Sequence, residues 1–137
     1  MGLDMYLTGE KFFPSHKIDR PLDLDGDRIQ QSEIELGYWR KFSPLHVYIV
    51  DTFAGGVDEC QRIDLEEGDL VAIAEAIMAE KLTPNEGSTG CFFGNDEIWD
   101  KYRGEKESHA ATFVAASEWL RQQPESQWRS VYYQASW

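Results

Sequence analysis

Three separate stretches of this sequence alternate apolar and polar residues with a period of two, and this pattern constrains the fold more than any other feature. Successive side chains of a β-strand point to opposite faces of the sheet, so a strand with one buried face shows this period. The alternation occurs within residues 3–7, 34–38 and 131–137. We therefore predict three strands there, the first ended by Gly9 and the second continuing to about Lys41.

Apolar residues at helical spacing predict three helices. The clearest stripe runs from Leu70 to Met78 and follows the i, i+3, i+4, i+7 pattern of a core-facing helix. Ser43 and Pro44 are typical of an N-cap followed by the first helical position. The predicted helices cover residues 43–53, 66–81 and 107–123.

Shorter segments complete the expected fold. Asp25-Gly26 between apolar residues favours a small hairpin, and short strands are expected at 59–65 and 91–93. Ile98, Trp99 and Tyr102 suggest an irregular helical turn. Together these elements predict a single α+β domain over residues 1–137, with a mainly antiparallel sheet of roughly four to six strands and about three helices packed on one face.

The charge of the chain limits its partners. Its 25 acidic residues against 13 basic ones give a net charge of −12. Such a surface repels phosphate backbones and anionic headgroups, which argues against general nucleic-acid or membrane binding. An acidic surface can instead attract a basic partner, including a protein surface that normally holds nucleic acid, although it also simply keeps a protein dispersed.

Cysteine usage and the N-terminal sequence predict a cytoplasmic protein. Cys60 and Cys91 form no CxxC pair, which suits a reducing compartment and free thiols. The chain opens without a basic region followed by a long apolar run, and no window approaches the length of a membrane span.

Motifs for metals, cofactors and familiar catalysis are missing from the sequence. The two cysteines and three histidines show no zinc-ligand spacing. The acidic residues around Asp25 fail the calcium-loop template, because Arg28 stands where glycine is needed and Ile34 where glutamate is needed. No glycine-rich phosphate loop or GxSxG motif occurs. We therefore predict no metal, no cofactor and no catalytic residues, and favour binding over enzymatic activity.

One stretch concentrates aromatic and cationic side chains and is the candidate ligand site. Arg40 and Lys41 are the only adjacent pair of basic residues, and Tyr38, Trp39 and His46 lie beside them. A flat ring could stack on the aromatic residues while the guanidinium binds an anion. The predicted ligand-binding residues are Tyr38, Trp39, Arg40, Lys41, His46, Tyr132 and Gln134.

Structural interpretations of the same residues remain open. Trp39 could lie in the core, while both cations pair with acids such as Glu33 or Glu35. His46 could be an acid or base, an anion ligand or a structural residue in the first turn of a helix. Together with Asp58 and Cys60 it also supplies the parts of a thiol nucleophile site, although the order of these residues implies no geometry.

Several phrases of the sequence resemble those of a known group of proteins. They are the opening MGLDMYL, the central GYWRK followed by His46, FFG at 92–94 and the closing YYQASW. Together they resemble a family of small proteins encoded by bacteriophages and prophages, end to end along the chain. Relatives end in Gln-Ser-Ser-Trp, whereas this chain has Ala135 in place of the first serine.

The resemblance implies an accessory protein of a phage or prophage. Small, acidic proteins of this kind disable host defences by blocking a nucleic-acid-guided or DNA-cutting complex, or by sequestering a signalling nucleotide. The leading hypothesis is therefore a binding protein that inhibits a host immune complex, such as an anti-CRISPR protein, through its acidic surface. The alternatives are a binder of a small nucleotide-like anion at the Tyr38–Lys41 and His46 cluster, and an enzyme that acts on an anionic substrate with His46 as acid or base.

Overall fold

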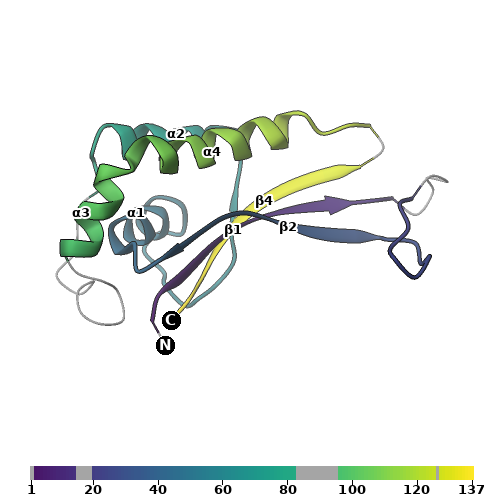
Figure 1. Ribbon diagram of the computed structural model, residues 1–137, viewed down its shortest axis with the longest axis horizontal. Helices are drawn as coiled ribbons and strands as arrows, with labels where there is room; N and C mark the ends of the chain where they lie inside the picture. Colours follow the sequence, from purple (N-terminus) through teal and green to yellow (C-terminus); the bar gives the residue numbers. More distant parts are fainter. Residues whose placement is uncertain (1, 15–19, 83–95, 126) are drawn as a thin grey trace.

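A computed structural model describes residues 2–14, 20–82, 96–125 and 127–137, and its main feature is one antiparallel sheet (Figure 1). The four strands lie in the order β2-β1-β4-β3. The strands are β1 (Asp4–Phe12), β2 (Gln31–Arg40), β3 (Ile63–Leu65) and β4 (Trp128–Ser136); the helices are α1 (Ser43–Phe53), α2 (Glu67–Met78), α3 (Asp96–Gly104) and α4 (Lys106–Arg121). The predicted α+β class and antiparallel sheet are confirmed, with α3 as an additional helix in the described part of the chain.

The register of the sheet decides which side chains face the helices. Met5 on β1 lies opposite Trp39 on β2 and Ala135 on β4, and Leu7 lies opposite Tyr133. Residues paired across strands point to the same side of a sheet. These residues therefore share one face, which we call the covered face because α1 and α4 pack against it. Figure 1 shows α2 lying beside α4 on this side of the sheet.

The close approach of α4 to the covered face depends on two glycines. A Cβ atom on Gly37 would lie 2.7 Å from the ring of Trp39 and 2.9 Å from the methyl carbon of Thr112. A Cβ on Gly9 would lie 2.8 Å from the ring of Trp119. The prediction that Gly9 ends the first strand is wrong, because β1 continues to Phe12; the missing side chain makes room for Trp119 instead.

Two other element predictions need correction. α1 spans the expected residues, but its N-cap is Phe42, which places Ser43 inside the helix without a capping bond. The strand expected at 59–65 is reduced to β3, since Cys60 adopts a left-handed backbone with φ 59° that interrupts an extended chain. The strand expected at 91–93 lies outside the described residues.

The hairpin around Gly26 forms as predicted, and its acidic residues have a local role. Leu22 and Arg28 form an antiparallel bridge, and Gly26 has φ 84°. The Oδ1 atom of Asp23 accepts hydrogen bonds from the backbone nitrogens of Asp25 and Asp27, both at 2.9 Å. Asp23 therefore stabilises the turn itself, as short acidic side chains commonly do.

Candidate functional site

The sheet separates the residues predicted to form one ligand site. Tyr38 and Arg40 lie on the opposite side of β2 from Trp39, because neighbouring strand residues alternate. Lys41 follows the strand with φ 58°, and its backbone nitrogen donates to the carbonyl of Leu3 at 2.8 Å. Tyr132 and Gln134 share the side of Tyr38, since they pair through Thr8 and Tyr6 of β1. His46 contacts Tyr133 and therefore lies on the covered side.

Trp39 belongs to the core of the covered face. Its side chain is 3% exposed and stacks on Phe113 of α4, with ring centroids 5.1 Å apart and an interplanar angle of 5°. Its Nε1 donates to Nδ1 of His109 at 3.0 Å. Burial lowers the pKa of His109, although the neighbouring Glu105 acts in the opposite direction. Because its ring is already packed on both the helix and the histidine, Trp39 offers no free face for a ligand.

His46 forms the centre of a buried polar network on the covered side. Its Nδ1 lies 2.6 Å from the hydroxyl of Tyr133, and its Nε2 lies 2.8 Å from Oδ2 of Asp58. His46 and Tyr133 are 2% and 1% exposed. Burial raises the pKa of Tyr133 well above its usual value, and the nearby Asp58 adds to this effect. The network joins three parts of the chain: α1, the segment that precedes β3, and strand β4. It occupies both ring nitrogens of His46.

The opposite side of the sheet carries no helix in the described part of the chain. We call it the open face and define it by the side chains that share the register of Tyr6 and Tyr38, together with Arg62, which reaches over it. Its residues are Asp4, Tyr6, Thr8, Glu10, Phe12, Gln31, Glu33, Glu35, Tyr38, Arg40, Arg62, Asp64, Trp128, Ser130, Tyr132, Gln134 and Ser136. Acidic residues outnumber the two arginines on this face, which also presents three tyrosines.

At one end of the open face, Tyr38 and Arg40 converge on Asp4. The Tyr38 hydroxyl donates to Oδ1 of Asp4 at 2.6 Å, and Nε of Arg40 lies 3.9 Å from the same oxygen. The hydrogen bond to this carboxylate is the main reason why the pKa of Tyr38 is raised to about 12. The rings of Tyr6 and Tyr38 are in tilted contact at 5.3 Å. Arg40 thus pairs with an acidic residue of the neighbouring strand, Asp4; the structural interpretation expected such a pair and gave Glu33 and Glu35 as examples.

In the middle of the open face, Arg62 organises a second group. It forms ion pairs with Glu10 and with Asp64, the latter at 2.8 Å, and its guanidinium lies 4.1 Å above the centre of the Tyr132 ring. Glu10 is only 2% exposed and also accepts a hydrogen bond from Nε2 of Gln31 at 2.6 Å. No sequence pattern indicated this group, because Arg62 lies far along the chain from both Glu10 and Tyr132.

Tyr132 and Gln134 stabilise this face more than they expose binding groups. The Tyr132 hydroxyl donates to Glu33 at 3.5 Å, and its side chain is 9% exposed. Nε2 of Gln134 donates to the carbonyl of Cys60 at 2.9 Å. This bond joins the left-handed turn at Cys60 to β4 on the open face. The same segment contacts His46 on the covered side through Asp58, so it is held from both sides of the sheet.

Other kinds of site receive no support from the described residues. Within them, no group of three or more His, Cys, Asp and Glu side chains could hold a metal ion. None of the helices in the described ranges has the length and apolar character that crossing a bilayer requires. Comparison of the chain with protein-family models, with curated proteins and with solved structures finds no match. The site must therefore be interpreted from its own chemistry.

Proposed function

We propose that this protein is a binding protein that uses its open face to dock a basic surface of a protein partner. The observation that carries the proposal is the chemistry of this face: exposed tyrosines stand among carboxylates on a sheet that no described helix covers. Tyr6 and Tyr38 are 38% and 46% exposed. Tyrosine is enriched in protein interfaces, because its rigid ring offers apolar contact area and its hydroxyl a hydrogen bond.

The charge of the open face favours a cationic partner. Glu33, Glu35 and Asp64 are exposed there, whereas Arg62 is already engaged by Glu10 and Asp64. In a chain of net charge −12, the wider field reinforces the attraction of a basic surface. Complementary charge mainly accelerates encounter and excludes wrong partners, while the tyrosines supply contact area.

The phage resemblance suggests what this partner would be. A host defence complex that binds nucleic acid presents a basic channel, and an acidic, rigid sheet could occupy such a channel. We therefore propose that the protein inhibits a host immune complex by docking on its basic surface. The arrangement of Tyr38–Lys41 and His46 favours neither of the alternatives, which are binding of a small nucleotide-like anion and catalysis with His46 as acid or base. Trp39 and His46 are buried on the other side of the sheet from Tyr38.

A photo-crosslinking experiment tests the proposal. A photoreactive phenylalanine derivative is placed either at Tyr38 on the open face or at Val114 on the outer surface of α4; both side chains are 46% exposed, so the two probes are matched. Each protein is irradiated in lysate of the bacterial host. We expect one host protein to be captured in a salt-sensitive manner from position 38 and not from position 114. Equal capture at both positions, or none at position 38, would contradict the proposal.

A further inference from the structure

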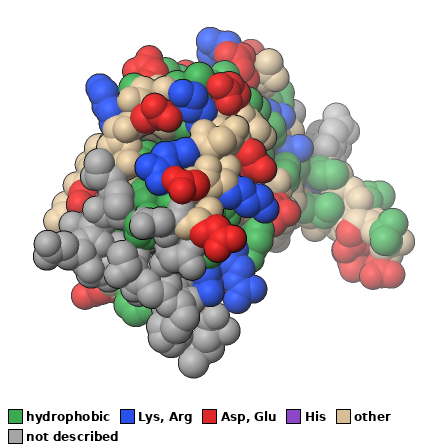
Figure 2. Space-filling view, turned by 60° about the vertical axis from the view of Figure 1, so that its left-hand side comes forward, with side chains coloured by type: hydrophobic (Ala, Val, Ile, Leu, Met, Phe, Trp, Pro, Cys, Tyr) green, Lys and Arg blue, Asp and Glu red, His purple; other side chains and the backbone are tan. Residues whose placement is uncertain are grey.

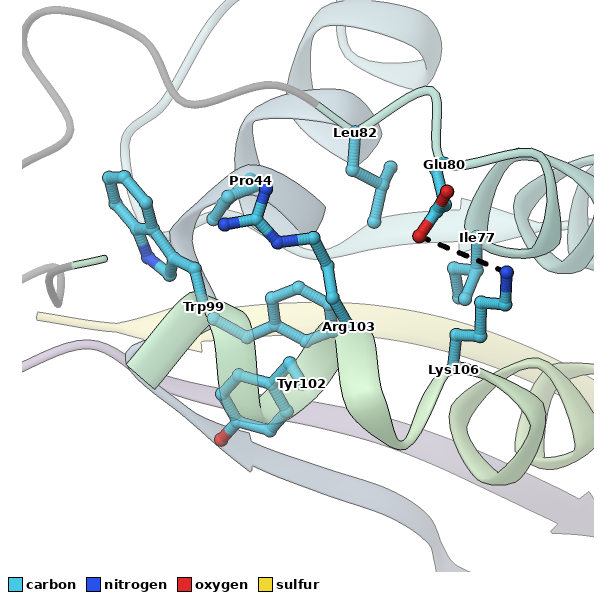
Figure 3. Close-up of a pocket in the computed structure, with 9 residues that line it drawn as sticks. Pro44, Ile77, Glu80, Leu82, Trp99, Tyr102, Arg103 and Lys106 are labelled. Carbon is cyan, nitrogen blue, oxygen red and sulfur yellow. Dashed lines mark ion pairs between the residues drawn. The ribbon is translucent and has the colours of Figure 1, made fainter. Parts of the chain in front are cut away.

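A cavity lies where the ends of the helices meet, apart from both faces of the sheet. Its volume is about 170 Å³. Figure 3 shows the side chains that surround it, which come from the start of α1, the end of α2, α3 and the start of α4. The lining residues are Phe42, Pro44, Ile77, Glu80, Leu82, Trp99, Tyr102, Arg103 and Lys106.

Six of the nine lining residues of this cavity are aromatic or aliphatic. Phe42 stacks on Tyr102, with ring centroids 4.2 Å apart and an interplanar angle of 5°. The Tyr102 hydroxyl donates to the carbonyl of Arg40 at 2.7 Å and accepts from its backbone nitrogen at 3.1 Å. In Figure 3 this hydroxyl points away from Leu82 and Ile77. Tyr102 therefore presents its ring to the cavity, while its polar group is used elsewhere.

Two cations stand at the same cavity. Arg103 lies near the end of α3 and Lys106 at the start of α4; in Figure 3 the guanidinium of Arg103 lies beside Pro44, whereas the ammonium of Lys106 lies across the cavity beside Glu80. Glu80 follows α2 with φ 54°, and its Oε1 lies 3.8 Å from Nζ of Lys106. Arg103 also contacts Asp100 of its own helix, whose side chain is 70% exposed.

The charges of this region leave room for an anion. Among the lining residues, two cations face the single carboxylate of Glu80. The ion pair between Lys106 and Glu80 is long, and the one between Arg103 and Asp100 is solvent-exposed, so both cost little to rearrange. Figure 2, which brings the α3 end of the molecule forward, shows basic side chains interspersed with acidic ones there.

We propose that the cavity binds a small organic acid, with its apolar body between the aromatic and aliphatic walls and its carboxylate at Arg103. A guanidinium matches the two oxygens of a carboxylate. The volume limits the ligand, because pockets for drug-sized molecules begin at about 300 Å³. The cavity therefore fits a monocarboxylate the size of phenylacetate better than a nucleotide. This site is independent of the open face.

Titration calorimetry with three probes separates charge from shape. Phenylacetate carries both an apolar ring and a carboxylate, phenylacetamide has the same shape without the charge, and inorganic phosphate has charge without an apolar body. We expect saturable binding of one phenylacetate per chain, with phenylacetamide at least about tenfold weaker and no saturation by phosphate. Equal affinity for the amide, saturation by phosphate, or no saturable binding of phenylacetate up to about 10 mM would overturn the proposal.

Two matched variants locate the site. Arg103→Gln removes the cation at the proposed carboxylate position and is expected to weaken phenylacetate binding by about tenfold. Lys101→Gln removes the same charge from an exposed position on α3 that does not line the cavity, and its affinity should stay within about twofold of the parent's. Equal affinity of both variants would contradict the assignment of the carboxylate to Arg103.

Discussion

The two faces of the sheet use neighbouring residues of similar chemistry for different purposes. On β2, Trp39 is buried on the covered face and Tyr38 is 46% exposed on the open face. On β4, Tyr133 is buried against His46, whereas Tyr132 lies under Arg62 on the open face. One step along a strand thus changes an aromatic residue from a part of the core to a part of a surface. The side of the sheet, more than the residue type, decides the role.

The polar groups of the two faces differ in the same way. On the covered face, His46 is 2% exposed and its ring nitrogens contact Tyr133 and Asp58, so removing either partner leaves a buried ring nitrogen unpaired. On the open face, the hydrogen bond between Tyr38 and Asp4 is exposed, so each residue can bond to water when the other is removed. A buried polar group without a partner costs about 1–3 kcal/mol, whereas an exposed one costs little. Substitutions should therefore separate stability from recognition.

The largest effect is expected from replacing the aromatic pair on β2. Trp39→Ala removes a buried ring that packs on Phe113, which should lower the free energy of unfolding by about 3–5 kcal/mol. Tyr38→Ala, one residue away, should lower it by about 1 kcal/mol or less. Urea denaturation followed by circular dichroism measures both values. Equal losses for the two variants would show that the faces do not differ as described.

A smaller effect is expected from removing single hydroxyl groups. Tyr133→Phe leaves Nδ1 of His46 buried without its partner, so the free energy of unfolding should fall by about 1–3 kcal/mol. Tyr38→Phe breaks an exposed hydrogen bond to Asp4 and should change it by no more than about 0.5 kcal/mol. The same denaturation assay applies. If Tyr133→Phe were neutral, the His46 network would not stabilise the fold.

A further difference between the faces is expected in alkaline solution, because the raised pKa values of Tyr38 and Tyr133 have different causes. Tyr38 has a pKa of about 12, mainly because of the carboxylate of Asp4, whereas burial raises the pKa of Tyr133. Both shifts favour the neutral phenol in the folded state. Their stabilising contribution is therefore complete below pH 10, the usual tyrosine pKa, and declines as the pH rises above it.

A carboxamide at position 4 separates these two causes. Asp4→Asn removes the charge beside Tyr38, so the pKa of Tyr38 should fall toward its usual value while that of Tyr133 stays raised. NMR titration of the tyrosine ring signals measures both. A Tyr38 pKa that stays near 12 in the variant would show that Asp4 is not its cause.

Local patterns predicted the elements that bury one side. Alternation identified β1, β2 and β4, and the apolar stripe from Leu70 identified α2, because burial of one face imposes a period on the sequence. The nine-residue helix α3 was expected only as an irregular turn, since its residues are mostly polar. Gly9 was misread because a glycine that permits close packing looks the same in sequence as one that ends a strand.

The candidate site was harder to predict, because it depends on contacts between distant residues. Alternation along a strand implies opposite faces for Tyr38 and Trp39, but both are aromatic, so the sequence could not say which face the helices cover. The partners Tyr133 and Arg62 were not associated with His46 and Glu10, since only the strand order β2-β1-β4-β3 brings them together. The cavity at Arg103 likewise exists only where several helix ends meet.

The central claim is that the open face recognises a basic partner while the covered face maintains the fold. Its most direct test is the dissociation constant of the partner captured through position 38, measured for Glu35→Lys on the open face and for Glu75→Lys on the exposed side of α2. Both variants change the net charge equally. We expect Glu35→Lys to weaken binding by about tenfold or more, with unchanged stability, and Glu75→Lys to have little effect. Equal weakening by both variants would contradict the claim.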